Sequence, residues 1–232
     1  MIRLFFIFMT FFPFLMEAAR VRKHSVAKGA HTKGVHKVIS PKTRIVIDAG
    51  HGGDDFGTKT PGLSGSTIEK ILNLKTAEYV AALLRKAGYE VVMTRRRDVF
   101  VALADRVEIA NRSKAALMVS IHFNAAQSKE AEGLEIYYSK EGSVDRKNSS
   151  KKLAESVMQT ALQMTKAKSR GVKMANFHVI RYTTIPSILV EGGFLTNERE
   201  LEKIRQDSYL KALAQGIVEG VNAYFKPKGD AV

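Results

Sequence analysis

From residue 44 onward, short segments with strand character alternate with longer segments of helical periodicity. The expected strands lie at residues 44–48, 89–95, 116–123, 133–139, 176–180 and 187–192. The expected helices lie at residues 67–86, 102–113, 149–167 and 208–225. Strands separated by helices are typical of the α/β class, with a single open, mostly parallel twisted sheet and helices on both faces. We therefore expect one domain over residues 44–226 and a short tail at 227–232.

The N-terminus has the pattern of an export signal. Arg3 precedes an apolar run at residues 4–16, and the small residues Ala18 and Ala19 follow it. Because the run is too short to span a membrane comfortably, we predict a signal peptide over residues 1–19 and a periplasmic or wall-associated protein. An uncleaved anchor or a buried apolar helix is the alternative. The chain has no cysteine, which excludes disulfides, thiolate metal sites and a catalytic cysteine.

Positive charge is concentrated directly after this signal. The chain has a formal net charge of +14, and residues 20–44 contain eight Lys or Arg residues and no acidic residue. We predict a basic flexible linker over residues 20–43. It either contacts an anionic wall or membrane surface or is simply solvated. Nucleic acid would suit the charge but not the export signal, so no nucleic-acid partner is expected. The protein is expected to be a monomer.

Four residues stand out by their position relative to the expected strands. His51 follows the first strand, Glu69 begins a helix, His122 ends the third strand and Glu191 ends the last. The carboxyl ends of parallel strands meet along one edge of an α/β sheet, where ligands bind. Two imidazoles and a carboxylate suit Zn²⁺ and leave a fourth position for water. Glu191 is then the carboxylate available for proton transfer.

Each of these residues also has a local explanation. Glu69 follows Ser66 by three residues, as in a helix capping box. His122 could be a hydrogen-bonded core histidine, and His51 could belong to an anion-binding turn. Glu191 could be a helix-flanking carboxylate before Gly192 and Gly193. The sequence contains no H-E-x-x-H motif, so spacing alone leaves these alternatives open.

Other polar residues are expected to have supporting roles. Asp48 is expected to hold the free ring nitrogen of His51, with a strand-end turn as the alternative. Arg106 and Asn111 are expected to hold loops in place, and Asn124 to hydrogen-bond substrate or play no part. His178 lies in an expected strand and is interpreted as structural.

Five ordered motifs resemble those of a known family. They are IDAGHGG (47–53), STIEK (66–70), TRRRDVFVALADRVEIAN (94–111), SIHFNA (120–125) and PSILVEGGFLTN (186–197). In this order they resemble the zinc-dependent N-acetylmuramoyl-L-alanine amidases of the AmiC-like (type 3) family, over about residues 43–226. The resemblance implies zinc ligands at His51, Glu69 and His122 and a catalytic glutamate at Glu191.

The same resemblance implies a reaction and a biological role. The bond cleaved would join the lactyl group of N-acetylmuramic acid to L-alanine of the peptidoglycan stem peptide, in septal wall splitting during cell division. Some members of the resembled family carry an insertion whose helix blocks the groove. Here the corresponding interval, 139–171, has room for little more than one helix. We therefore expect an open groove that needs no activating partner.

Three other functions can be set against this one. A penicillin-sensitive serine carboxypeptidase would use S-x-x-K, which occurs at Ser149 but also at Ser25, and no S-x-N triplet accompanies it. A non-catalytic wall-binding module could retain the same fold. A deacetylase of wall sugars could use the same metal chemistry. Analysis of the reaction products distinguishes these alternatives.

Overall fold

The computed structural model of the chain describes residues 42–58 and 68–226. The signal peptide expected at 1–19, nearly all of the linker expected at 20–43 and the tail at 227–232 lie outside the described residues. Among the helices of the two described ranges, none is long and apolar enough to cross a membrane.

The described residues contain six strands: β1 (Arg44–Ala49), β2 (Glu90–Met93), β3 (Leu117–Asn124), β4 (Leu134–Ser139), β5 (Ser169–Ala175) and β6 (Ser187–Phe194). They form one sheet in the order β2-β1-β3-β6-β4-β5. β2, β1, β3 and β6 are parallel to one another, whereas β4 is antiparallel to β6 and β5 is parallel to β4. The predicted α/β class with a mostly parallel sheet is confirmed.

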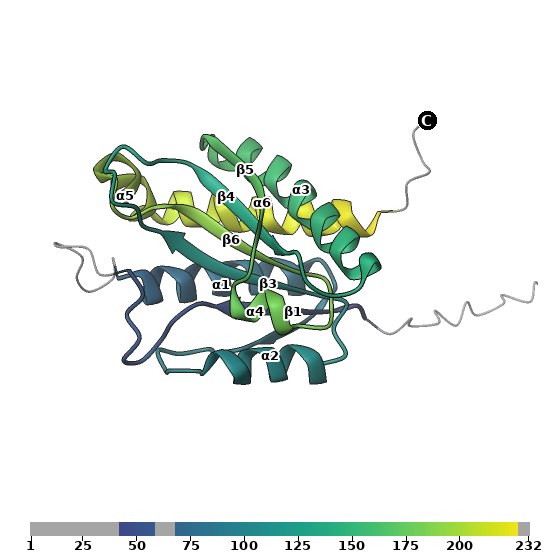
Figure 1. Ribbon diagram of the computed structural model, residues 1–232. Helices are drawn as coiled ribbons and strands as arrows, with labels where there is room; N and C mark the ends of the chain where they lie inside the picture. Colours follow the sequence, from purple (N-terminus) through teal and green to yellow (C-terminus); the bar gives the residue numbers. More distant parts are fainter. Residues whose placement is uncertain (1–41, 59–67, 227–232) are drawn as a thin grey trace, which may run out of the picture. The chain divides into compact units, whose positions relative to one another are not determined.

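Helices cover both faces of this sheet (Figure 1). They are α1 (Glu69–Lys86), α2 (Leu103–Arg112), α3 (Val144–Thr165), α4 (His178–Tyr182), α5 (Glu198–Ile204) and α6 (Asp207–Phe225). The larger apolar core joins α1, α3 and α6 to one face. A smaller core joins α2 and α4 to the other face. Alternate residues of β1, β3 and β6 therefore pack into two different layers.

The helices of the larger layer pack closely because α6 contains two glycines four residues apart. A Cβ atom at Gly216 would lie 2.5 Å from the Cα of Ala161, and one at Gly220 would lie 2.4 Å from the Cα of Val157. Both contacts are with the backbone of α3, which a side chain on α6 would displace. The hydroxyl of Thr160 also donates to the carbonyl of Gly216 at 2.6 Å. This layer gives the sheet a firmly packed support on the face opposite α2 and α4.

The expected strand at 176–180 is wrong. The strand lies earlier, at β5, and most of the expected segment belongs to the short helix α4. A short apolar run cannot be assigned to helix or strand by periodicity alone, and Val179 and Ile180 are both buried in α4. β5 was missed because it is an edge strand that contains Gly171 and has no clear apolar alternation.

Helix α5 was also not predicted. It has only seven residues, mostly charged, and therefore no apolar periodicity to reveal it. Its start is fixed locally, because the side chain of Asn197 accepts a hydrogen bond from the backbone N–H of Glu200. The other expected helices are present with shifted ends, the largest shift being at α3, which begins at Val144 rather than near 149.

A buried carboxylate at the end of β1 ties together the elements that carry the site. Asp48 Oδ1 accepts hydrogen bonds from Thr94 Oγ1 and Arg106 Nη1, both at 2.7 Å, and Oδ2 accepts one from Ser120 Oγ at 2.6 Å. Burial alone would raise the pKa of Asp48, but the charge of Arg106 and these hydrogen bonds outweigh it and lower the pKa. The carboxylate is therefore ionised and fully partnered.

Replacing Asp48 with Asn should destabilise the fold strongly. The side chains of Asp48 and Arg106 are only 1% and 2% exposed, so the variant leaves a buried guanidinium without its counter-charge. We expect the free energy of unfolding at neutral pH, measured with urea, to fall by about 3–5 kcal/mol. Because folding lowers the pKa of Asp48, this loss should shrink as the pH falls below about 3.9, through the folded-state pKa.

The exposed pair of Glu108 and Arg112 provides a matched control, because it lies on α2, the helix that also carries Arg106. These side chains are 60% and 80% exposed, so Glu108→Gln should change stability by no more than about 0.5 kcal/mol. Equal effects of Asp48→Asn and Glu108→Gln would contradict the expectation that leaving the buried guanidinium of Arg106 without its counter-charge is costly.

Candidate functional site

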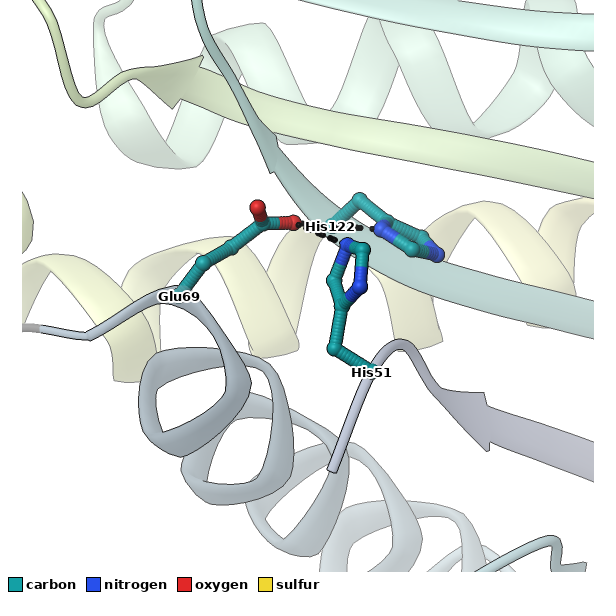
Figure 2. A group of neighbouring side chains, drawn as sticks. All are labelled: His51, Glu69 and His122. Carbon is teal, nitrogen blue, oxygen red and sulfur yellow. Dashed lines mark hydrogen bonds and ion pairs between the residues drawn. The ribbon is translucent and has the colours of Figure 1, made fainter. Parts of the chain in front are cut away.

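Three elements bring His51, Glu69 and His122 together. His51 follows β1, Glu69 is the first residue of α1, and His122 lies near the end of β3. One possible ligand atom from each lies within 4.8 Å of the others. His51 Nε2 is 3.2 Å and His122 Nδ1 is 3.1 Å from the same oxygen, Glu69 Oε1 (Figure 2). The sequence prediction that these three residues meet is confirmed by this geometry.

The arrangement fits a metal ion. Ligand atoms held at roughly 2.0–2.1 Å from a tetrahedral ion lie about 3.3 Å apart. The two distances to Glu69 Oε1, 3.2 Å and 3.1 Å, are close to that separation. Two imidazole nitrogens and a carboxylate oxygen form a donor set that first-row divalent metals accept. These residues could therefore hold such an ion with little movement.

Glycines provide the space in which the three side chains approach. A Cβ atom on Gly50 would lie 2.1 Å from the ring of His122. At Gly57, where φ is +77°, a Cβ would lie 2.5 Å from Glu69 Oε2 and 2.8 Å from the ring of His51. His51 itself has a φ of 60°, an uncommon conformation for a residue with a side chain. The Gly-rich loop after β1 is therefore required by the close packing of the site.

Glu69 is nearly buried and is held from several directions. Its Oε2 accepts a hydrogen bond from the backbone N–H of Thr58 at 2.6 Å, and its Oε1 accepts a longer one from Asn73 Nδ2 at 3.3 Å. Burial acts to raise the pKa of Glu69, but its hydrogen bonds with His122 and His51 outweigh burial and hold the pKa well below its usual range. The carboxylate is therefore ionised.

The capping-box explanation of Glu69 is wrong. The N-cap of α1 is Ile68, so Glu69 occupies the first helical position rather than the third, and the cap makes no side-chain hydrogen bond. Ser66, the residue expected to complete the box, lies outside the described residues. The side chain of Glu69 points toward two imidazoles instead (Figure 2).

Asp55, not Asp48, orients His51. Asp55 Oδ2 lies 2.8 Å from His51 Nδ1, whereas the oxygens of Asp48 are occupied by Thr94, Ser120 and Arg106. A carboxylate on the far nitrogen fixes the ring orientation of a metal-binding histidine and leaves Nε2 facing the site. Sequence reasoning missed Asp55, although it lies only four residues after His51 in the same loop.

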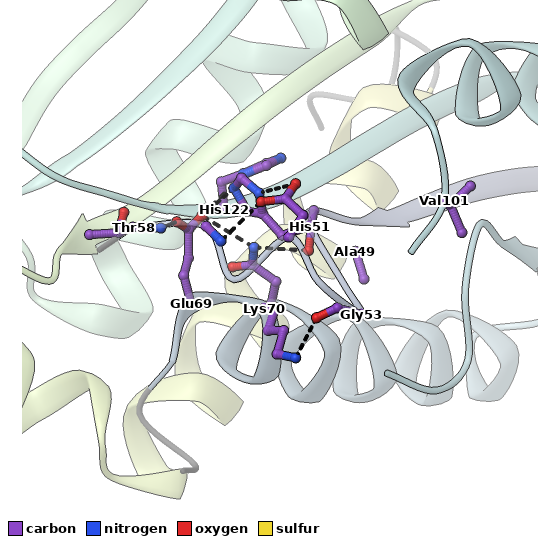
Figure 3. Close-up of polar contacts among 12 residues, drawn as sticks. Ala49, His51, Gly53, Thr58, Glu69, Lys70, Val101 and His122 are labelled. Carbon is purple, nitrogen blue, oxygen red and sulfur yellow. Dashed lines mark hydrogen bonds and ion pairs between the residues drawn. The ribbon is translucent and has the colours of Figure 1, made fainter. Parts of the chain in front are cut away.

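Long cationic side chains hold the loop that carries His51. Arg106 donates from Nη1 to the carbonyl of Ala49 at 2.6 Å and from Nη2 to that of His51 at 2.7 Å. Figure 3 shows Lys70 reaching the carbonyl of Gly53, at 2.7 Å. The expectation that Arg106 pins a loop is thus confirmed. Asn111 does the same elsewhere, since its Oδ1 accepts a hydrogen bond from the backbone of Thr184 at 2.7 Å.

Glu191 lies beside this group on β6, in register with His122. Its Oε2 is buried and has no hydrogen-bond partner among residues 42–58 and 68–226. Burial raises the pKa of Glu191 well above its usual value, and the negative charges of Glu69 and Glu135 raise it further. A buried carboxyl group of raised pKa next to a set of metal-binding side chains is typical of a proton-transfer site.

A cavity of about 370 Å³ opens beside His51 and His122. Apolar side chains supply much of its lining: Phe100, Val101, Leu103, Phe177, Val179 and Leu189. His178 also lines it, because it begins helix α4 rather than lying in a strand. The placement of His178 in a strand is therefore wrong. Because a strand was expected at 176–180, the position of His178 beside the cavity was not predicted.

Asn124 makes its contacts within the protein. Its Nδ2 donates to Glu135 Oε2 at 2.9 Å, and its Oδ1 accepts a hydrogen bond from the backbone of Ala125 at 2.8 Å. A direct contact of Asn124 with substrate stays a prediction.

Comparison with known proteins places this geometry in a family. Residues 45–223 match the family model described as Amidase_3, N-acetylmuramoyl-L-alanine amidase. Protein YqiI of Bacillus subtilis is 36% identical over 187 residues, covering 81% of this chain and 86% of YqiI. The N-acetylmuramoyl-L-alanine amidase LytC of the same organism is 37% identical over 182 residues, covering 78% of this chain but only 35% of LytC.

A solved structure has the same fold. The crystal structure of N-acetylmuramoyl-L-alanine amidase from Clostridium difficile 630 superposes with a TM-score of 0.76 at 39% identity. The match covers 82% of this chain and 100% of that structure. With the family model spanning nearly the whole sheet and its helices, the chain belongs to the N-acetylmuramoyl-L-alanine amidase (Amidase_3) family.

Proposed function

We propose that this protein is a zinc-dependent peptidoglycan hydrolase. It cleaves the amide between N-acetylmuramic acid and L-alanine of the stem peptide. The observation that carries the proposal is the convergence of His51, Glu69 and His122 within 4.8 Å, with Glu191 in register beside His122. The names of LytC and of the Clostridium difficile structure support the choice of bond. Two imidazoles and a carboxylate are ligands that catalytic zinc sites use.

Each residue has a distinct task in this reaction. A zinc ion held by His51, Glu69 and His122 would polarise the scissile carbonyl and lower the pKa of a water molecule. Glu191 takes a proton from the water that attacks the carbonyl carbon. It then returns a proton to the amide nitrogen, which leaves as the free amine of alanine. The products are the lactyl carboxylate of the sugar and the stem peptide.

The proposal extends to where the protein acts. Residues 1–19 direct export and are followed by the basic linker at 20–43, which contacts an anionic wall or membrane surface. The catalytic domain at 44–226 then cuts peptidoglycan in the wall during septal splitting. The wall-associated role agrees with the similarity to LytH from Staphylococcus saprophyticus, a probable cell wall amidase.

Substitutions at the site should separate metal binding from turnover. His51→Ala, His122→Ala and Glu69→Gln should each lower zinc content and activity together, because each removes a ligand. Glu191→Gln should keep full zinc content and a normal unfolding transition, but lose at least about 100-fold in kcat, the usual size of general acid–base catalysis. Zinc is measured by atomic emission and turnover with soluble muropeptides.

His178→Ala is the matched control for metal content. His178 lines the same cavity but is not among the three clustered residues, so its variant should retain zinc. Zinc loss in Glu191→Gln equal to that in His122→Ala would show that Glu191 is a ligand. Normal zinc and activity in Glu69→Gln would contradict its assignment as a ligand.

Product analysis should identify the bond that is cut. The mature protein, loaded with zinc and incubated with wall fragments, should release stem peptides that begin with a free alanine amine, detected by mass spectrometry. Release of acetate instead would indicate a deacetylase. Covalent labelling of Ser149 by a β-lactam would indicate a serine carboxypeptidase. No product and tight wall binding would indicate a non-catalytic module.

The same assay tests whether a partner is required. The interval 139–171 contains α3 and the start of β5, with no additional helix. Glu141 in this interval is exposed, and its backbone is held by Ser139 and Arg146. We therefore expect full activity from the purified protein alone. Activity that appears only after a second protein is added would overturn this expectation.

A further inference from the structure

A second polar cluster lies beside Glu191, outside the three clustered metal-binding residues. At its centre is Glu135 on β4, whose side chain is only 3% exposed. Arg170 Nε and Lys173 Nζ donate to Glu135 Oε1 at 2.5 Å and 2.7 Å. Tyr137 Oη and Asn124 Nδ2 donate to Oε2 at 2.5 Å and 2.9 Å. The two cations of this cluster reach the surface, with side chains that are 38% and 40% exposed.

Strand register places this cluster at a definite distance from the metal-binding residues. Glu135 pairs with Glu191 across β4 and β6, and Glu191 pairs with His122 across β6 and β3. Register partners point to the same face of a sheet, and neighbouring strands lie about 4.8 Å apart. Glu135 is therefore about 10 Å from His122, on the same face, with β5 one strand farther out.

An irregularity in β5 aims both cations at this face. In a regular strand, residues three apart point to opposite faces, so Arg170 and Lys173 would diverge. The pairing of β4 with β5 shifts register between Leu134 and Ile136, and Gly171 has a φ of +87°. A bulge of this kind redirects a side chain. As a result, both cations reach the same oxygen of Glu135.

Neutralising Glu135 does not account for both cations. One carboxylate faces two positive charges, whose side chains are 38% and 40% exposed, so one positive charge remains in excess at the surface. Of the three guanidinium nitrogens of Arg170, only Nε donates a hydrogen bond to another described residue. Both terminal nitrogens are therefore free donors within the described part of the chain. The guanidinium is also steadied over the ring of Phe194, at 4.9 Å. A planar, fixed guanidinium with free donors suits a carboxylate.

The surfaces on the two sides of the cluster of His51, Glu69 and His122 differ in polarity and charge. On the side of β1 and α2 lies the cavity with its apolar lining, where Phe100 and Leu103 are exposed. On the side of β4 and β5 lie the two cations. Tyr137 links the sides through an edge-to-face contact with Phe177, with ring centroids 5.1 Å apart. An anionic part of a substrate that crosses the site would avoid the apolar side, since burying a charge there is costly.

We propose that Arg170 and Lys173 bind a carboxylate of the stem peptide, one residue beyond the alanine released by the reaction. The inference rests on the proposed function. An extended chain advances roughly 3.3–3.6 Å per residue. A carboxylate on the second residue therefore lies about 7–10 Å from the scissile carbonyl, which matches the separation of the cluster from His122. The pair thereby makes the enzyme prefer stem peptides whose second residue carries a free carboxylate over those in which it is amidated.

The test uses two N-acetylmuramoyl tripeptides, each L-Ala–γ-D-Glu–L-Lys, with the α-carboxyl group of glutamate either free or amidated. The wild-type protein should have a KM about tenfold lower for the free acid, the difference that one charge-assisted contact of moderate strength provides. Arg170→Gln and Lys173→Met should each raise the KM for the free acid toward that of the amide. They should leave kcat for both substrates, and KM for the amide, nearly unchanged. Arg170→Lys should retain part of the preference.

Lys168→Met is the matched control. Lys168 is a neighbouring cation, 71% exposed, that pairs with Glu132 rather than Glu135, so its loss should leave the preference intact. Equal losses on both substrates in Arg170→Gln would mean that the cations serve only to neutralise Glu135, and would overturn the proposal. Unchanged kinetics on both substrates would overturn it as well.

A binding measurement separates this inference from the proposed function. Calorimetry with the two tripeptides lacking the sugar, L-Ala–γ-D-Glu–L-Lys free or amidated, needs no turnover. The wild-type protein should bind the free acid more tightly, and Arg170→Gln should abolish the difference. Equal affinity for both peptides in the wild-type protein would refute the carboxylate site even if the enzyme is an amidase. Preserved selectivity without turnover would refute only the amidase proposal.

Discussion

The buried ion pair between Asp48 and Arg106 is the interaction on which the site depends. Asp48 fixes the guanidinium at the end of β1, and the guanidinium then holds the carbonyls of Ala49 and His51. This matters because His51 has an unfavourable φ of 60°, which persists only where the surroundings enforce it. A buried charge pair contributes little net stability by itself. Here the pair holds the guanidinium of Arg106 in place, and the guanidinium fixes the backbone that carries the imidazole of His51.

The reversal of strand direction at β4 gives the site more residue types than a fully parallel sheet would. Parallel strands bring only their carboxyl ends to the binding edge, which supplies His51, His122 and Glu191. Because β4 runs antiparallel to β6, its beginning reaches the same edge and brings Glu135 beside Glu191. β5 follows β4 and adds cations. The mixed topology thus places an anionic group and a cationic group side by side.

The sequence was sufficient to locate those polar side chains that lie at the end of an apolar strand or at the start of a periodic helix. His51, His122 and Glu191 could be predicted because each directly ends or follows a clear apolar strand, and Glu69 because it opens a periodic helix. Asp55 and His178 could not be predicted, since their roles depend on the path of a loop and on a five-residue helix without periodicity. β5 escaped prediction because Arg170 and Lys173 contact Glu135, while Val172 is the residue of this strand that packs against the larger core.

Three carboxylates lie in and beside the site, Glu69 on α1 and the register partners Glu191 and Glu135 on β6 and β4, and their partners give them different chemical properties. Glu69 faces two imidazoles, and these hydrogen bonds keep its pKa low despite burial. Glu135 accepts hydrogen bonds from Lys173, Tyr137 and Arg170, which lower its pKa in the same way. Glu191 lies next to both, has a buried oxygen without a partner in the described ranges, and has a raised pKa. Because a proton can be exchanged near neutral pH only by a group whose charged form is not strongly stabilised, Glu191 is the carboxylate of the three that suits proton transfer. The negative charges of Glu69 and Glu135 themselves add to the effect of burial in raising the pKa of Glu191.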